Sequence, residues 1–343
     1  MGTTELDATA RELVAPGRGI LAADESTGTI AKRFKSIDVE STEENRRRYR
    51  EMLFTTPALG EYISGVILFD ETIRQAAADG TSFTEILEKA GMIPGIKVDT
   101  GATPLALFPG ETVTEGLDGL RERLAEYRTL GARFAKWRAV ITIDEANGLP
   151  TDAAIRANAH ALGRYAALSQ EAGIVPIVEP ETLMDGSHAI DAHYEATVRT
   201  LKATFEELST QRVALEGTLL KTNMVLSGKD AAEQAGPDTV AEMTLKALRE
   251  TVPDTIPGIV FLSGGQSDED ATVHLDAMNR KGPHPWELSF SYGRALQAPS
   301  LKAWSGRPDG VEAGQRALAH RAQLNGAARD GRYSSDMESE NPA

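Results

Sequence analysis

The sequence predicts a single-domain (β/α)8 barrel, the TIM-barrel architecture of the α/β class. Eight short apolar runs with the character of buried strands alternate with segments of helical periodicity, a pattern typical of parallel strands joined by helices. The length of 343 residues fits one barrel, and a hydrophobic content of 41% is enough for a large core. No linker-like stretch divides the chain. We therefore expect one barrel domain over residues 1–324, including an N-terminal helix, and a mobile polar C-terminal tail over residues 325–343.

The expected strands are short apolar runs bounded by polar or turn-forming residues. They cover residues 19–24, 63–69, 95–99, 134–141, 174–181, 215–224, 258–265 and 287–293. The fifth of them contains Pro176 and Pro180, which cannot donate hydrogen bonds to a sheet and so weaken its predicted pairing.

The expected helices are assigned from apolar periodicity and from start and stop residues. The first helix stops at Pro16-Gly17, and a capping box at residues 41–44 opens the second. The segments cover residues 1–16, 41–53, 84–90, 116–129, 152–172, 190–208, 239–251, 269–278 and 313–324.

Composition excludes several classes of function. A net charge of −15 argues against a nucleic-acid-binding surface, although a local group of cations can still bind an anion. The absence of cysteine excludes disulfides, thiolate nucleophiles and Cys-ligated metal sites. No apolar run approaches the roughly 18 residues of a membrane span, and the N-terminus lacks the features of a secretory signal. We expect a cytoplasmic protein with no nucleic-acid or membrane partner.

The run from Leu215 to Met224 is where the sequence places the chemistry. A strand period of two puts Gly217, Leu219 and Lys221 on one face, which therefore ends in an amine. Desolvation at the end of an apolar run lowers the pKa of a lysine from about 10.4, so the amine can attack a carbonyl and form a Schiff base. The alternative is a strand-end lysine whose ammonium simply reaches water.

Polar side chains gather at the ends of many of the expected strands. In a barrel the C-terminal ends of the strands carry the active site, so these side chains are expected to meet. The alternative is that strand ends are solvated and collect charge for that reason alone. The residues are Asp24, Lys97, Asp99, Lys136, Arg138, Glu179, Glu181, Lys221, Ser263 and Arg294.

A Schiff-base enzyme also needs a neighbouring cation, a proton carrier and a base for bond cleavage. Lys136 is the candidate cation, since a like charge helps to keep a lysine neutral. Glu179 and Glu181 lie two residues apart on one strand face, where one carboxyl of a pair can be pushed toward a neutral pKa while the other stays ionised. Asp24 is available as the base for bond cleavage.

Two anion sites are expected to flank this amine. The loops Ser263-Gly264-Gly265 and Tyr292-Gly293-Arg294 follow the last two strands, where barrels commonly bind phosphate through backbone N–H groups and a cation. Lys97, with the hydroxyls of Ser26 and Thr29, can form a second anion site across the mouth. Two such sites beside one amine suggest a bisphosphate.

Six motifs together resemble the class I fructose-bisphosphate aldolase family. The similarity runs from about residue 5 to 333, and the motifs are long, ordered and specific. They are Leu-Ala-Ala-Asp-Glu-Ser-Thr-Gly at 21–28, Ala-Lys-Trp-Arg at 135–138, Val-Glu-Pro-Glu at 178–181, Gly-Thr-Leu-Leu-Lys at 217–221, Phe-Leu-Ser-Gly-Gly-Gln at 261–266 and Phe-Ser-Tyr-Gly-Arg at 290–294.

The resemblance implies reversible cleavage of fructose 1,6-bisphosphate to dihydroxyacetone phosphate and glyceraldehyde 3-phosphate, without metal or cofactor, in a homotetramer. By motif position it makes Lys221 the Schiff-base lysine, Glu179 the acid/base of the carbinolamine steps with Glu181 in support, Asp24 the residue assisting C3–C4 cleavage, and Lys136 the cation beside the imine. It assigns the C1-phosphate to Ser263, Gly264, Gly293 and Arg294, the C6-phosphate to Ser26, Thr29 and Lys97, and further substrate contacts to Arg138, Leu262 and Ser291.

The chain departs from the family pattern in three places. Animal members usually end in a tyrosine that speeds proton exchange, whereas this chain ends in Pro342-Ala343, and Tyr333 matches an internal family position. Thr29 stands where many relatives have serine, and Thr222 where a proline often follows the lysine. These differences concern rate and substrate preference rather than the core reaction.

Two other functions remain as alternatives. A metal-dependent aldolase would need clustered histidines, but the six histidines fall in expected helices and loops rather than at strand ends. A non-catalytic phosphosugar-binding or scaffold protein could keep the fold. The joint presence of Lys221, Glu179, Lys136 and Asp24 argues against that loss of catalysis.

Overall fold

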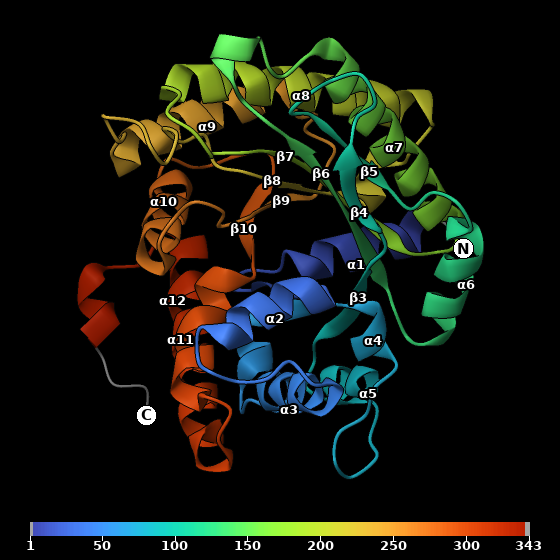
Figure 1. Cartoon of the computed structure of the whole chain (residues 1–343), viewed down its shortest axis with the longest axis vertical. Coiled ribbons are helices and arrows are strands. Elements are labelled where there is room, and N and C mark those ends of the chain that lie inside the picture. The colour runs from blue at the N-terminus through green and yellow to red at the C-terminus, as the bar shows by residue number, and fades with distance from the viewer. Residues whose placement is uncertain (1–2, 340–343) are drawn as a thin grey trace.

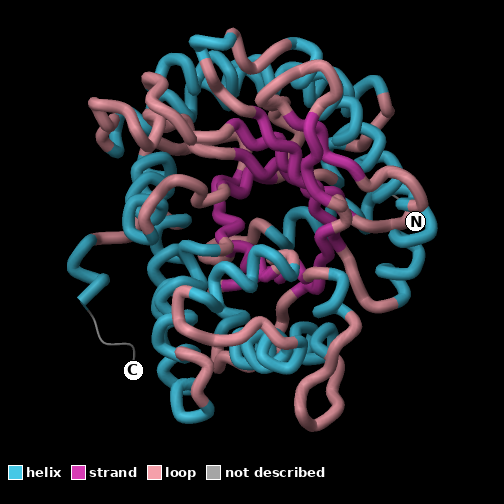
Figure 2. Tube along the Cα trace, in the orientation of Figure 1, coloured by secondary structure: helices cyan, strands magenta, loops and turns pink. Residues whose placement is uncertain are grey.

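Eight parallel strands close into a barrel in the computed structural model, which describes residues 3–339. The ring of strands is visible nearly end-on in Figure 2, with helices around it. Around the ring the order is β1, β2, β3, β6, β7, β8, β9 and β10, so neighbours in the barrel are also successive barrel strands in the chain. The predicted (β/α)8 barrel is confirmed. The strands are β1 (Gly19–Ala23), β2 (Ile63–Leu68), β3 (Ile93–Lys97), β6 (Phe134–Ile141), β7 (Val175–Thr182), β8 (Leu219–Thr222), β9 (Gly258–Phe261) and β10 (Glu287–Tyr292).

Helices cover the outside of this ring and one of its ends (Figure 1). Thr151 begins one of the longest of them as an N-cap, because its hydroxyl accepts a hydrogen bond from the Ala154 N–H at 3.2 Å. The α-helices are α1 (Thr3–Leu13), α2 (Thr27–Lys35), α3 (Glu43–Phe54), α4 (Asp70–Ile73), α5 (Phe83–Lys89), α6 (Leu120–Thr129), α7 (Asp152–Glu171), α8 (Ile190–Thr210), α9 (Pro237–Thr251), α10 (Asp268–Arg280), α11 (Arg294–Trp304) and α12 (Val311–Arg329).

Several elements differ from those expected. Helices α2, α4 and α11 and the antiparallel hairpin of β4 (Gly101–Pro104) and β5 (Thr112–Glu115) were not predicted. The last long helix continues to Arg329 rather than ending at 324, since Asn325 and Ala328 lie on its buried face. Residues 1–2 of the expected first helix and residues 340–343 of the expected tail lie outside the described residues.

The predicted strand over 215–224 is wrong in its first part. Residues Leu215–Gly217 form a 3-10 turn, and β8 begins only at Leu219. The side chain of Gln170 fixes this turn, because its amide accepts from the Ala214 N–H and donates to the Ala214 carbonyl. A side chain at Gly217 would meet Leu6 of α1 at 2.7 Å, so a glycine is needed at this approach. The alternation that places Lys221 therefore runs only from Leu219.

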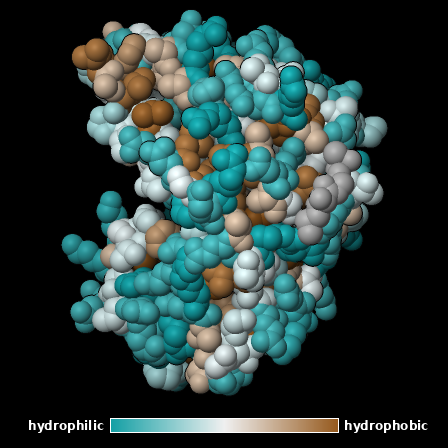
Figure 3. All heavy atoms as spheres, turned by 90° about the vertical axis from the view of Figure 1, so that its right-hand side faces the viewer, coloured by the Kyte–Doolittle hydropathy of each residue, from teal (hydrophilic) through white to brown (hydrophobic). Residues whose placement is uncertain are grey.

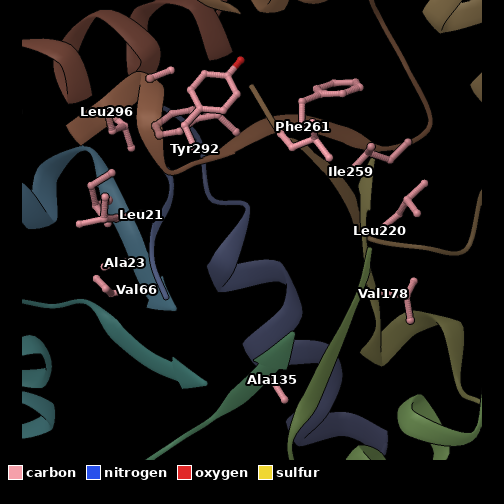
Figure 4. Close-up of a cluster of buried hydrophobic side chains, with 14 of the residues drawn as sticks. Leu21, Ala23, Val66, Ala135, Val178, Leu220, Ile259, Phe261, Tyr292 and Leu296 are labelled. Carbon is pink, nitrogen blue, oxygen red and sulfur yellow. The ribbon is translucent and has the colours of Figure 1, made fainter. Parts of the chain in front are cut away.

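Alternate residues of each strand face the barrel interior and the surrounding helices. Ile20, Ile177 and Leu219 belong to the inner apolar cluster. Their neighbours Leu21, Val178 and Leu220 belong to the outer cluster, which packs against the helices and is shown in Figure 4. Every second residue of a strand therefore faces the barrel interior, up to the C-terminal end of the strand.

Helix α1 closes the N-terminal end of the barrel. Its Leu6, Ala10 and Leu13, with Val14 just beyond its end, pack on the inward side chains in the inner apolar cluster. Two strand glycines leave room for this helix: a Cβ at Gly65 would lie 2.6 Å from Leu13, and one at Gly258 would lie 2.7 Å from Val14. This end of the barrel is apolar and filled.

One face of the molecule shows how polar and apolar residues are distributed on the surface. On the face shown in Figure 3, hydrophilic residues predominate and apolar atoms appear as scattered patches. No helix among residues 3–339 is long and apolar enough to cross a membrane.

Candidate active site

A cavity of about 440 Å³ opens at the C-terminal end of the barrel, opposite α1. Strand alternation explains its lining, because the inward rows that begin with apolar residues in β6, β7 and β8 continue with charged ones. Asp99 and all fifteen residues to which the family resemblance assigns a role line this one cavity. The fifteen are Asp24, Ser26, Thr29, Lys97, Lys136, Arg138, Glu179, Glu181, Lys221, Leu262, Ser263, Gly264, Ser291, Gly293 and Arg294.

Glu179 lies between two lysines at the centre of this cavity. Its Oε1 is 3.2 Å from Nζ of Lys221, and its Oε2 is 3.2 Å from Nζ of Lys136. Lys136 Nζ also lies 2.8 Å from Oδ2 of Asp24. The four side chains form one chain of alternating charge, and all are largely removed from water. The two lysines are thus joined through a shared carboxylate.

Opposing effects set the protonation of these groups. Burial alone would raise the pKa of Asp24 and of Glu179, but the attraction of Lys136 and then of Lys221 outweighs it and lowers both pKa values. Burial would lower the pKa of Lys136, but the attraction of Asp24 and then of Glu179 raises it well above its usual value. The expectation of a carboxyl pushed toward a neutral pKa is wrong for Glu179 in the free protein, because two cations contact it.

A second row of ion pairs surrounds this chain. Arg138 on β6 pairs with Glu181 on β7, and its backbone N–H donates to Oδ2 of Asp99 at 3.2 Å. Oδ1 of the same aspartate lies 2.7 Å from Nζ of Lys97. Arg138, expected to contact substrate, is therefore held by carboxylates from both neighbouring strand segments, and Lys97 by the carboxylate two residues further along its own segment.

The loops after β9 and β10 meet on another side of the cavity. The guanidinium of Arg294 donates to the carbonyls of Ser263 and Gln266, which ties the two loops together. Gly265 has φ +74°, and a Cβ there would lie 2.0 Å from Met184, so only glycine fits this turn. Arg294 also begins α11, and a helix N-terminus favours anions. The two loops, the N-terminus of α11 and the guanidinium of Arg294 therefore come together, and this combination favours binding of an anion.

The hydroxyl of Ser291 lines the cavity next to these loops. It is buried and makes no hydrogen bond to the described residues. A buried hydroxyl without a partner destabilises the protein, so a polar ligand group is the natural acceptor or donor for it.

Helix α2, which follows β1, supplies the adjoining wall, because β1 is the barrel neighbour of β10. Ser26, its N-cap, and Thr29 approach each other at 3.2 Å between their hydroxyl oxygens. Arg33 lines the same wall and pairs with the buried carboxylate of Glu25, which Arg50 also holds. Sequence reasoning missed Glu25 and Arg33. The signal was the spacing 26, 29 and 33, which puts three polar residues on one helical face.

The histidines take no part in this cavity. None of the six lines it, and residues 3–339 contain no group of three His, Cys, Asp or Glu side chains placed to hold a metal ion. Chemically, the site offers a lysine amine beside a carboxylate, a second cation, a buried aspartate and anion sites on two walls. This arrangement can convert a ketone to an imine and bind phosphate groups on either side of it.

Comparison with known proteins gives a consistent result. The family model described as fructose-bisphosphate aldolase class-I matches residues 5–343. A probable fructose-bisphosphate aldolase class 1 of Xanthomonas campestris pv. campestris is 58% identical over 334 residues, covering 97% of this chain and 99% of its own. The cytosolic fructose-bisphosphate aldolase 4 of Arabidopsis thaliana is 53% identical over 337 residues, covering 98% and 85%.

Among solved structures, fructose-bisphosphate aldolase from Plasmodium falciparum, in complex with TRAP and a small-molecule inhibitor, superimposes with a TM-score of 0.96. It is 49% identical to this chain, and the match covers 97% of this chain and 96% of that one.

Proposed function

The chain belongs to the class-I fructose-bisphosphate aldolase family, and from this premise we propose that Lys221 is the lysine that forms the Schiff base. The enzyme is a lyase: it cleaves fructose 1,6-bisphosphate reversibly to dihydroxyacetone phosphate and glyceraldehyde 3-phosphate in glycolysis, by the metal-independent route of its family. The relatives do not support the alternative of a non-catalytic scaffold.

The contact between Lys221 and Glu179 carries the proposal. Before Lys221 can attack the C2 carbonyl, its Nζ must lose a proton, and Oε1 of Glu179 stands 3.2 Å away to accept it. The charge of Lys221 is one cause of the low pKa of Glu179, so its loss raises that pKa and lets the carboxyl hold the proton. Glu179 then returns the proton to the carbinolamine hydroxyl, which leaves as water and gives the iminium ion.

Asp24 is the proposed base for bond cleavage. Its low pKa keeps it ionised, and it takes the proton of the C4 hydroxyl. The C4 oxygen then forms the aldehyde carbonyl, the C3–C4 bond breaks, and its electron pair moves to the iminium nitrogen to give an enamine. Lys136, 2.8 Å from Asp24, stays charged and stabilises developing negative charge beside the imine.

The two phosphates are proposed to bind at separate parts of the cavity lining. The loops of Ser263, Gly264, Gly293 and Arg294 suit the C1-phosphate because they combine backbone donors with a guanidinium at a helix N-terminus. Ser26, Thr29 and Lys97 suit the C6-phosphate. Glu181 is proposed to support Glu179 by holding Arg138 against the substrate, and Leu262 and Ser291 complete the contacts.

Borohydride trapping tests the assignment. The protein is reduced with dihydroxyacetone phosphate present, with and without EDTA, and its peptides are mapped by mass. We expect a substrate-dependent adduct on Lys221 in both samples, and none on Lys221→Met. An adduct on a different lysine, or dependence on the metal, would overturn the proposal.

We also propose that the protein is a cytoplasmic homotetramer. The tetramer is supported by the family resemblance of the sequence, and the location by Arabidopsis relatives named cytosolic. Light scattering on the purified protein should give the mass of four 36.8-kDa chains. Residues 330–339, expected to belong to a mobile tail, contact the helices instead: the Tyr333 N–H donates to Oδ1 of Asp276 at 2.9 Å, and Glu338 pairs with Arg321.

A further inference from the structure

The ladder between β7 and β8 is incomplete where the catalytic lysine lies. Along residues 3–339, these strands pair only at Ile177 with Leu219 and at Val178 with Leu220. On its other side, β7 pairs with β6 over all eight of its residues. Lys221 is therefore held by strand pairing to β9 alone, although its proton acceptor Glu179 is on β7.

Pro180 explains why the pairing stops. The N–H groups of Val175 and Leu183 donate to β6 and its continuation, so odd-numbered residues of this strand direct their N–H groups to that side. Even-numbered residues direct theirs toward β8, as Thr182 does. Pro180 is the residue at which the next donor to β8 would stand, and it has no N–H group.

Asn223 and His193 close the gap that follows. Asn223, two residues after the lysine, accepts from the Thr182 N–H at 2.9 Å through its Oδ1. Its Nδ2 donates to the Thr197 hydroxyl of α8 at 3.1 Å and to the Met224 carbonyl at 3.2 Å. One buried side chain thereby joins the ends of both strands to a helix.

The imidazole of His193 on α8 bridges the same two segments. Its Nδ1 lies 2.9 Å from the Leu226 carbonyl oxygen and 3.0 Å from the Leu226 nitrogen, and its Nε2 lies 3.1 Å from the Thr182 carbonyl oxygen and 3.2 Å from Nδ2 of Asn223. With the proton on Nε2 the ring bonds Leu226 and Thr182, and with the proton on Nδ1 it bonds Leu226 and Asn223, so either neutral tautomer ties α8 to these segments. The ring is fully buried, and burial lowers the pKa of His193 to about 4. It therefore stays neutral, and these contacts persist across the physiological pH range.

We propose that His193 and Asn223 are positioning residues for the Schiff-base reaction: they replace the strand pairing that Pro180 removes and hold Lys221 in register with Glu179. Neither residue lines the cavity, so they act through the strand ends rather than on the substrate. The inference rests on the proposed role of Lys221. The loops proposed to bind the C1-phosphate follow β9 and β10, and the contacts of His193 and Asn223 do not hold them.

The test compares Asn223→Ala with Asn325→Ala. Asn325 is an equally buried asparagine that joins α12 to α10, accepting from the Thr272 hydroxyl and donating to the Arg321 carbonyl, away from β7 and β8. For Asn223→Ala we expect kcat, and the rate of borohydride-trapped adduct formation, to fall on the order of 10- to 100-fold through misplacement of Lys221, with KM within about threefold. Asn325→Ala should lower Tm while kcat stays within about twofold.

Each outcome decides the matter. Unchanged kcat in Asn223→Ala overturns the inference, as does an equal fall of kcat in both variants at equal loss of Tm. If Asn223→Ala does not fold, His193→Gln is measured by the same criteria. The wild-type trapping reaction separates the two hypotheses: no adduct on Lys221 there refutes the proposed function, whereas a normal adduct with an unaffected variant refutes only the positioning role.

Discussion

The two ends of the barrel are built from the same strands and yet have opposite characters. At the N-terminal end, the inward residues of β6, β7 and β8 are Phe134, Val175 and Leu219, which pack under α1. Two to four residues further along these strands, the inward residues are Lys136, Glu179 and Lys221. Inward and outward positions alternate without interruption along each strand. The filled apolar end and the charged open end therefore differ only in the type of side chain at the inward positions.

This difference teaches where stability and reactivity reside. The apolar end gains free energy by burial, and its side chains contact nothing that reacts. The charged end buries ionised groups, each of which is unfavourable until a partner neutralises it. Four predictions can break or sharpen the comparison: the first two concern turnover, from the larger effect to the smaller, the third concerns stability against pH, and the fourth concerns stability with turnover unchanged.

The largest effect is expected from Lys221→Ala. Without the amine no imine forms, so turnover should fall by more than roughly 10⁵-fold while the fold is retained. Steady-state kinetics and circular dichroism measure the two quantities. Normal activity in this variant would show that the reacting amine lies elsewhere.

Glu179→Gln should have the next largest effect. The amide cannot accept the proton of Lys221 or return it to the carbinolamine, so kcat should fall roughly 10²- to 10⁴-fold. The variant also leaves Lys136 with one carboxylate contact fewer. Single-turnover trapping of the imine is the decisive measurement, since a variant limited only in product release would form the imine at the normal rate.

A pH-dependent effect on stability is expected at Asp24. Its pKa is lowered by folding, so the ionised carboxylate contributes stability that is present above its unfolded pKa near about 4 and is lost as pH falls below that value. The stability of the wild type relative to Asp24→Asn should therefore shrink on acidification. Thermal unfolding of both proteins between about pH 3 and 7 checks the sign. A constant difference would mean that Asp24 has no paired charge in solution.

At the apolar end, Leu13→Ala should leave turnover unchanged. The side chain, at the end of α1, is fully buried against Gly65, so its truncation should destabilise the protein by about 2–5 kcal/mol. Denaturant unfolding and kcat at a temperature well below Tm give the two quantities. A fall in kcat of the folded enzyme would contradict the separation of the two ends.

Much of the fold follows from local patterns in the sequence. The barrel strands appear as short apolar runs, and their polar ends identify the cavity, because inward and outward positions alternate with a fixed period. Helix α11 was missed because Gly293 precedes it and Pro299 lies within it, and both residues ordinarily argue against a helix. The hairpin of β4 and β5 was missed because its strands have only four residues each and are largely unburied, so they lack the apolar alternation that predicts a strand.

The electrostatics of the site could not be derived from the sequence in the same way. Paired glutamates suggested a carboxyl with a raised pKa, but the sign of the shift depends on how far Lys136 and Lys221 lie from Glu179. Those distances depend on the register between strands that are remote in the chain. The prolines of β7 were recognised as lost donors. The sequence does not show, however, that the nitrogen of Pro180 faces β8, and only this orientation links the proline to Asn223 and His193.

The lining of the cavity also affects how substrate arrives. Six basic and five acidic side chains line it, a net charge of +1 in a protein whose net charge is −15. A sugar bisphosphate is therefore repelled at long range and attracted only within about a Debye length of the mouth, roughly 8–10 Å. Added salt should then speed the diffusional encounter while weakening the bound state, the reverse of the pattern in electrostatically steered enzymes.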